Sequence, residues 1–76
     1  MSASTRVLFL FRSIHHVLAA EAALKAAGIL LDMIPVPKEL SSTCGMAITV
    51  DPSDRARAVE AVAATHPVRV IDDWKP

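Results

Sequence analysis

One stretch of the sequence, IPVPKELSSTCGM at residues 34–46, most constrains the fold. It holds the only cysteine, one of the two glycines and two of the five prolines of the 76-residue chain. Proline fixes the backbone φ angle and has no N–H to donate, so Pro35 and Pro37 suit an edge strand and its exit. The stretch is therefore predicted to be an edge strand followed by a polar loop that ends at Cys44.

Length and cysteine count bound the class of protein. A chain of 76 residues predicts one domain, residues 1–76, with a small hydrophobic core. The single cysteine excludes an intrachain disulfide and a zinc site built from several cysteines. Because 53% of the residues are apolar, which is a high share for this size, the composition favours a homo-oligomer.

Charge and hydropathy argue against two classes of partner. Lys plus Arg number 8 and Asp plus Glu number 8, so the net charge is zero and no nucleic-acid partner is expected. No apolar run approaches the ~20 residues of a membrane span, and the run at 7–11 is too short for a secretory signal. We therefore expect a cytoplasmic protein without a membrane partner, whose Cys44 is reduced at rest.

The pattern of apolar residues and turn residues predicts six elements. In chain order these are a strand at 6–11, a helix at 13–27, strands at 29–36 and 45–50, a helix from 51 to about 65 and a strand at 68–72. This order predicts an α+β, ferredoxin-like β-α-β-β-α-β sandwich, an antiparallel sheet of four strands with two helices on one face. The strands at 6–11 and 45–50 contain no proline and are expected at the centre.

Both predicted helices carry recognisable start or stop signals. Ser13 is a suitable N-cap, and Gly28 lies where the residue after the first helix must turn left-handed. Asp51 followed by Pro52 indicates the start of the second helix. The buried stripes are expected to contain Ile14, Val17, Leu18 and Leu24 in the first helix and Ala56, Val59, Val62 and Ala63 in the second.

The predicted topology locates the thiol. Because the two central strands are antiparallel, Cys44 should lie near the end of the strand at 6–11, close to Arg12 and the first turn of the first helix. That turn offers unpaired backbone amides and the positive end of the helix dipole, and it carries His15 and His16. Each of these features favours a thiolate, so Cys44 is predicted to be a reactive nucleophile of lowered pKa.

Other interpretations of these residues stay open. Free cysteines are often small buried core residues, which would make Cys44 structural. A metal site of His15, His16 and Cys44 would lack the second cysteine or carboxylate cluster that is usual in such sites. Ser41 and Ser42 have the character of loop hydroxyls that bond to nearby backbone groups.

Two motifs extend across the first two thirds of the chain. They are F-x-S-x-H-x-x-L-x-A-E-x-x-L-K-x-A-G-I at 11–29 and I-P-V-P-x-E-L-S-S-x-C-G-M-A at 34–47. With these motifs the chain, from about residue 6 to 72, resembles a family of small bacterial and archaeal domains described as putative selenium/sulfur carrier protein-like. It departs from the family pattern mainly at His16 and in the C-terminal strand, neither of which touches the thiol loop.

The resemblance implies a function for the thiol. Cys44 would carry sulfur or selenium as a persulfide or selenosulfide and pass it from a donor protein to an acceptor protein. Gly45, Ser41 and Ser42 would shape the loop, and Ser13 and His15 would lie across from it. No cofactor and no bound metal are expected.

Three hypotheses follow from the sequence, and they favour a carrier or binding protein over an enzyme. The first is a sulfur or selenium carrier that acts through Cys44. The second is a non-enzymatic interaction or small-ligand-binding module, dimeric and with a structural Cys44, because a fold does not by itself determine a function. The third is a metal-binding or redox-sensing thiol that uses Cys44 with His15 or His16.

Overall fold

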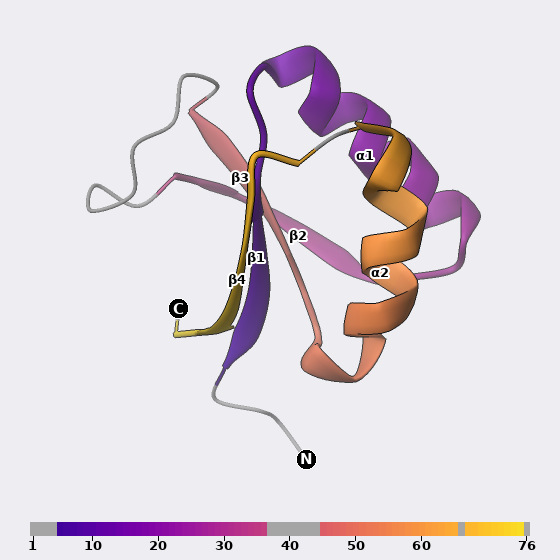
Figure 1. Ribbon diagram of the computed structural model, residues 1–76, viewed down its shortest axis with the longest axis vertical. Helices are drawn as coiled ribbons and strands as arrows, with labels where there is room; N and C mark the ends of the chain where they lie inside the picture. The colour runs from indigo at the N-terminus through magenta and orange to yellow at the C-terminus, as the bar shows by residue number, and fades with distance from the viewer. Residues whose placement is uncertain (1–4, 37–44, 66, 76) are drawn as a thin grey trace.

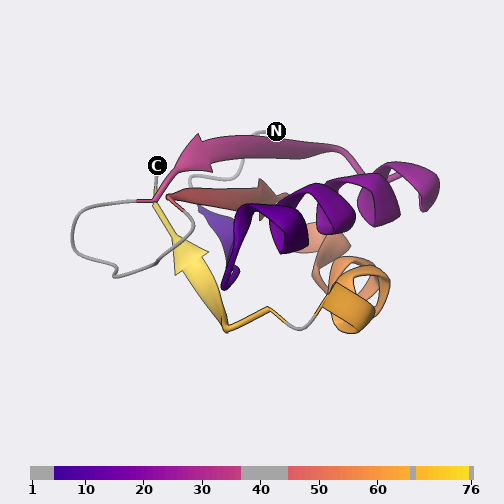
Figure 2. The same cartoon turned by 90° about the horizontal axis from the view of Figure 1, so that it is seen from above.

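The computed structural model describes residues 5–36, 45–65 and 67–75. Four strands form one sheet in the order β2-β3-β1-β4, in which all neighbours are antiparallel, and both helices cover the same face (Figure 1 and Figure 2). The elements are β1 (Arg6–Leu10), α1 (Ile14–Ala26), β2 (Leu31–Pro35), β3 (Met46–Val50), α2 (Arg55–Val62) and β4 (Arg69–Trp74), with short 3₁₀ helices η1 (Pro52–Asp54) and η2 (Ala63–Thr65) flanking α2. The predicted α+β, ferredoxin-like arrangement is confirmed.

The central strand β1 is buried on both of its faces, as its continuous apolar run predicts. Phe9 points toward the helices, where it belongs to the larger hydrophobic cluster, and it is fully buried. Leu8 and Leu10 point to the opposite face, where they form a second cluster with Ala47. Alternate residues of a strand face opposite sides of the sheet, so a strand buried on both sides must be apolar at every position.

The edge position of β2 explains its proline. The N–H of Val36 donates to the carbonyl of Gly45 at 3.1 Å, so Val36 directs its backbone groups toward β3. In an antiparallel pair, successive residues direct their backbone groups to opposite sides. Leu31, Met33 and Pro35 therefore direct theirs away from β3, toward the free edge, and Pro35 costs no ladder hydrogen bond.

The end of α1 confirms the prediction for Gly28. Gly28 has φ 76°, the left-handed conformation that a residue without a side chain adopts readily. Its N–H donates to the carbonyl of Lys25 at 3.0 Å, and the N–H of Ile29 donates to the carbonyl of Leu24 at 2.9 Å. These two bonds form a Schellman motif, which satisfies carbonyls at the end of the helix and turns the chain into β2.

The buried face of α1 differs from the predicted one. Val17 and Leu24 are buried as expected, but Ile14 is 41% exposed and Leu18 is 50% exposed. Ala20 is buried in their place. Because α1 is apolar on most of its sides, its residue spacing does not single out one face, and the small Ala20 lets the helix approach the sheet closely.

The second helix is also rotated relative to the prediction. Val62 is buried and Val59 partly buried, but Ala56 and Ala63 are exposed, whereas Ala58 is buried. The chain from Pro52 forms one 3₁₀ turn before the α-helix begins at Arg55. Alanines occur on several sides of α2, so the spacing of its apolar residues does not single out the side that faces the sheet.

Strand boundaries differ from the predictions by one to two residues at most ends. The largest extension is at the C-terminal strand, which continues to Trp74, beside Arg6 of β1. Trp74 packs on the cluster of Leu8, Leu10 and Ala47, and this packing stabilises the longer strand. Among the described residues, no helix has both the length and the hydropathy to cross a bilayer.

Replacement of Gly28 tests the left-handed turn. No atom lies within 4 Å of where a Cβ of this residue would stand, so substitution adds backbone strain without a side-chain clash. We expect Gly28→Ala to lower the free energy of unfolding by about 1 kcal/mol and Gly28→Asn by less, because Asn tolerates this conformation better. Urea denaturation checks this order, and an Ala variant as stable as the wild type would contradict it.

The cap before η1 predicts a pH dependence of stability. The carboxylate of Asp51 accepts from the N–H of Ser53 at 3.0 Å and from the Ser53 hydroxyl. These hydrogen bonds lower the pKa of Asp51 below its ordinary value. The stabilisation is therefore present above the unfolded-state pKa of about 3.9 and is lost as the pH falls through the lower folded-state pKa.

We expect Asp51→Asn, which keeps a capping side chain, to lose less stability between neutral and acidic pH than the wild type does. Urea denaturation at several pH values measures this difference. Glu60→Gln, which also removes one exposed carboxylate, is the charge-matched control and should keep more of the wild-type pH dependence. Equal flattening in both variants would contradict the assignment to Asp51.

Candidate functional site

The candidate site lies at the end of the sheet where β1 ends and β3 begins. Leu10, the last residue of β1, pairs with Ala47 near the start of β3. Gly45 precedes β3 directly, so it lies at the same edge as the segment that leads from β1 into α1. Gly45 is exposed and has φ 76°, a left-handed conformation that turns the chain as it enters the strand.

The start of α1 joins Ser13 to His16. Ser13 is extended, with φ −146° and ψ 163°, which directs its side chain back over the first turn. Its Oγ lies 2.8 Å from Nδ1 of His16 and accepts from the N–H of the same residue at 3.5 Å. The hydroxyl donates to a deprotonated Nδ1 and accepts from a protonated one, so the contact suits both states of the ring. The prediction of Ser13 as N-cap is confirmed.

The local electrostatics of this helix start are positive. No acidic residue occurs in the first turn of α1, so no side chain there offsets the positive end of the helix dipole. His15 and Arg12 are both exposed, whereas His16 is half-buried. An anion beside this turn would therefore meet backbone amides and a helix dipole that no acidic residue of the same turn offsets.

The residues predicted for the site divide into two groups. Arg12, Ser13, His15, His16 and Gly45 lie at one end of the sheet, four of them at the start of α1 and the fifth before β3. The structure joins the side chains of Ser13 and His16. The side chain of His15 follows a different direction, because adjacent residues of a helix are separated by about 100°. The remaining three residues, Cys44, Ser41 and Ser42, lie outside the described residues.

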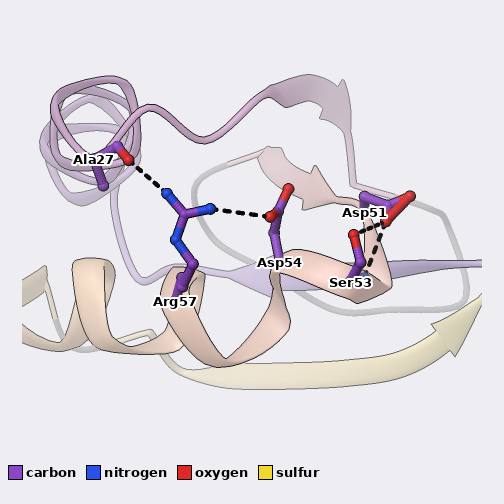
Figure 3. Close-up of polar contacts among 5 residues, drawn as sticks. All are labelled: Ala27, Asp51, Ser53, Asp54 and Arg57. Atoms are coloured by element: carbon purple, nitrogen blue, oxygen red, sulfur yellow. Dashed lines mark hydrogen bonds and ion pairs between the residues drawn. The ribbon is translucent and has the colours of Figure 1, made fainter.

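The structure also reveals polar contacts that the sequence patterns did not predict. The guanidinium of Arg57 in α2 donates to the carbonyl of Ala27 at 2.8 Å and lies 3.4 Å from a carboxylate oxygen of Asp54 (Figure 3). Arg57 thus binds the negative end of α1 from a neighbouring helix. The two residues are 30 positions apart, so no local pattern could have indicated this contact.

A second contact of this kind lies on the helix-free face of the sheet. Arg6 donates to the side-chain oxygen of Thr49 at 3.1 Å and to its carbonyl at 3.2 Å, and it lies 3.4 Å from Asp32. Thr49 is buried and gains its hydrogen-bond partner from this arginine. These residues lie at the opposite end of the sheet from Gly45, because Arg6 begins β1 and Leu10 ends it.

One shallow cleft of about 260 Å³ lies between the C-terminal end of α1 and α2. Its lining residues are Ala27, Arg57, Glu60 and Ala61. None of the predicted site residues contributes to it, and Arg57 is engaged by Ala27 and Asp54 as described above. The cleft therefore offers a structural contact between helices, and the described geometry assigns it no chemistry.

The described residues contain no group of three His, Cys, Asp or Glu side chains that could hold a metal ion. The metal site considered from the sequence requires Cys44 as its third ligand, and that residue lies outside the described ranges. His15 and His16 are adjacent in α1, and the ring of His16 is bonded to Ser13.

Comparison with known proteins identifies the family. The family described as putative Se/S carrier protein-like matches residues 6–71. This range includes nearly the whole described fold and the position of Cys44, and the chain therefore belongs to this family. Searches among curated proteins and among solved structures find no match.

Substitution of Ser13 tests the helix start. Ser13→Ala removes both the acceptor for the His16 amide and the partner of the His16 ring, so we expect the free energy of unfolding to fall by about 1 kcal/mol. Ser13→Thr keeps the hydroxyl and should lose markedly less. Urea denaturation measures stability, and NMR of the imidazole protons reports the loss of the ring contact. Equal destabilisation by Ala and Thr would contradict the role of the hydroxyl.

Proposed function

We propose that the protein carries sulfur or selenium on the thiol of Cys44, and that it receives this cargo from a donor protein and delivers it to an acceptor protein. The observation that carries the proposal is membership of the putative Se/S carrier protein-like family over residues 6–71. Cys44 is the only cysteine of the chain, so it is the only side chain that can form a persulfide.

The transfer step needs no external oxidant or reductant. The Cys44 thiolate attacks the terminal sulfur of a donor persulfide, R–S–S–H. A new S–S bond forms on Cys44, the donor S–S bond breaks, and the donor leaves as the thiolate R–S⁻ with the bonding electron pair. Delivery repeats this exchange with an acceptor thiolate. A selenium atom would be held in the same way, as a selenosulfide.

The geometry around the thiol loop supports this chemistry. Gly45, which follows Cys44 in the sequence, lies at the end of the sheet where β1 leads into α1. The positive end of α1, with no acid in its first turn, would favour a thiolate or a persulfide anion over the protonated form.

The supporting residues are assigned roles in the same proposal. Ser13 and His16, which are hydrogen-bonded to one another, would position the start of α1 toward the thiol. Arg12 and His15 would add positive charge, and the loop would be shaped by Gly45, Ser41 and Ser42. None of these residues needs to take part in the covalent exchange itself.

A pH titration of thiolate absorbance tests the reactive state of Cys44. We expect a pKa below the ordinary value of about 8.5, because helix amides and nearby positive charge stabilise the thiolate. Cys44→Ser provides the baseline, since it removes the only thiol. An ordinary or raised pKa would contradict the proposed environment and favour a structural cysteine.

Persulfide transfer tests the function directly. On incubation with glutathione persulfide, intact-protein mass spectrometry should show the addition of one sulfur atom in the wild type and none in Cys44→Ser. Subsequent incubation with a thiol acceptor should remove it. A native protein that stays unlabelled while the unfolded protein is labelled would refute the carrier proposal. A partner that binds wild type and Cys44→Ser equally would then favour an interaction module.

A further inference from the structure

Large apolar side chains are exposed on two sides of the molecule, most of them on α1 and just before β2. Among the described residues, the large hydrophobic side chains that are exposed are Ile14 at 41%, Leu18 at 50%, Leu30 at 85% and Val68 at 58%. Ile14 and Leu18 are one helical turn apart on α1, and Leu30 immediately precedes β2. Val68 lies beside the end of β1, at the start of β4, on the opposite edge of the sheet.

The exposed residues of α1 face the β2 side. The opposite side of α1 faces α2, because Ala27 lines a cleft together with Arg57, Glu60 and Ala61 of α2. At about 100° per residue, Leu18 is rotated about 180° from Ala27 around the helix axis. Within the helix layer, α1 lies on the β2 side and α2 on the β4 side (Figure 2). The exposed apolar side of α1 therefore lies along the β2 edge of the sheet.

The same flank carries the free edge of β2. Leu31 and Met33 direct their N–H and C=O groups away from β3, as the bond from Val36 to Gly45 requires. Among residues 5–36, 45–65 and 67–75, no strand pairs with β2 on this side. An unpaired row of backbone groups next to an apolar helix side is a template for another strand and another helix.

An opposite-charge pair lies on the same side of α1. Glu21 and Lys25 form an ion pair of 3.1 Å, one helical turn apart. Around the helix axis, Ile14 lies between Glu21 and Lys25, and Leu18 lies next to Lys25. All four side chains fall within about 60°. Two antiparallel copies of this helix would place Glu21 of each copy opposite Lys25 of the partner subunit, so the charges of this flank are complementary to themselves.

We propose that this flank, defined by the β2 edge with Leu18 and Leu30, binds a second copy of the chain in a two-fold symmetric dimer. β2 pairs antiparallel with its symmetry mate, which joins the two four-stranded sheets, and α1 packs against the partner's α1. A two-fold interface uses the same surface on both copies, and this flank combines a strand edge, apolar side chains and alternating charge that satisfy that requirement.

Charge and proline select the strand register. With Asp32 opposite itself, two carboxylates would be adjacent, which is destabilising. With Met33 opposite itself, Asp32 instead faces Ile34 of the partner subunit. In that register the carbonyl of Pro35 accepts from Leu31 of the partner subunit. The missing N–H of Pro35 costs one bond in each of the two Leu31–Pro35 pairs, which is two bonds per dimer. We therefore assign the two-fold axis to Met33.

Sedimentation equilibrium over a concentration series tests the dimer. We expect wild-type dimers and an increase in the dimer dissociation constant of about 100-fold or more for Leu18→Glu, which buries a charge in the interface twice. Val68→Glu is the matched control, because it changes an exposed hydrophobic residue on the other edge, and it should stay within about threefold of wild type. Circular dichroism checks that each variant is folded.

Exchanging the charges of Glu21 and Lys25 tests the same interface even if Leu18→Glu fails to fold. Glu21→Lys alone should raise the dissociation constant about tenfold, because it places like charges together across the two-fold axis. Adding Lys25→Glu restores opposite charges within and between copies and should return the constant to within about threefold of wild type. This rescue distinguishes an interface role from a simple loss of helix stability.

Three outcomes would overturn the proposal. They are a wild-type protein that stays monomeric at millimolar concentration, a dimer that Val68→Glu disrupts and Leu18→Glu does not, and a double charge variant that fails to restore dimers. The proposal does not depend on the carrier function. Cys44→Ser should leave the dissociation constant unchanged while it abolishes persulfide formation.

Discussion

Burial of β1 on both faces is the constraint on which the rest of the structure depends. Phe9 packs beneath the helices, and Leu8 packs on the opposite face, each with essentially no exposed surface. Full burial of one such side chain stabilises a protein by about 1.5–3 kcal/mol, a large share of the stability of so small a domain. A strand with this property must be central, so β3 and β4 flank it and β2 lies at an edge of the sheet.

The edge position of β2 connects the fold with both proposals. Pro35 is tolerated because the backbone groups at its position face away from β3. By the same alternation, the N–H and C=O groups of Leu31 and Met33 also face away from β3. Gly45, which precedes β3, lies at the end of the sheet where β1 leads into α1. The proposed thiol chemistry thus belongs to one end of the sheet, and the proposed dimer surface to its β2 side, so a dimer would leave the two functions separable.

The sequence predicted the elements of the candidate site better than their contacts. Ser13 was correctly predicted as an N-cap, because capping depends on residues within one helical turn. Its bond to the ring of His16 depends on side-chain rotamers, and the pattern could not specify these. The contact between Arg57 of α2 and the end of α1 was not predicted, since Ala27 is distant from Arg57 in the sequence. The sequence itself singled out Cys44, the family membership supplies its proposed carrier role, and the fold shows at which end of the sheet Gly45 lies.

The sequence by itself determined the fold class, the order of the elements and the central and edge strands. These follow from local signals, namely apolar runs, capping residues, the left-handed Gly28 and the placement of proline. Only the tertiary structure decided which side of each helix is buried. α1 is apolar on most sides, so the close approach allowed by Ala20 selected its buried side and left Ile14 and Leu18 exposed. Such a choice depends on packing between distant segments, which residue spacing along one helix does not encode.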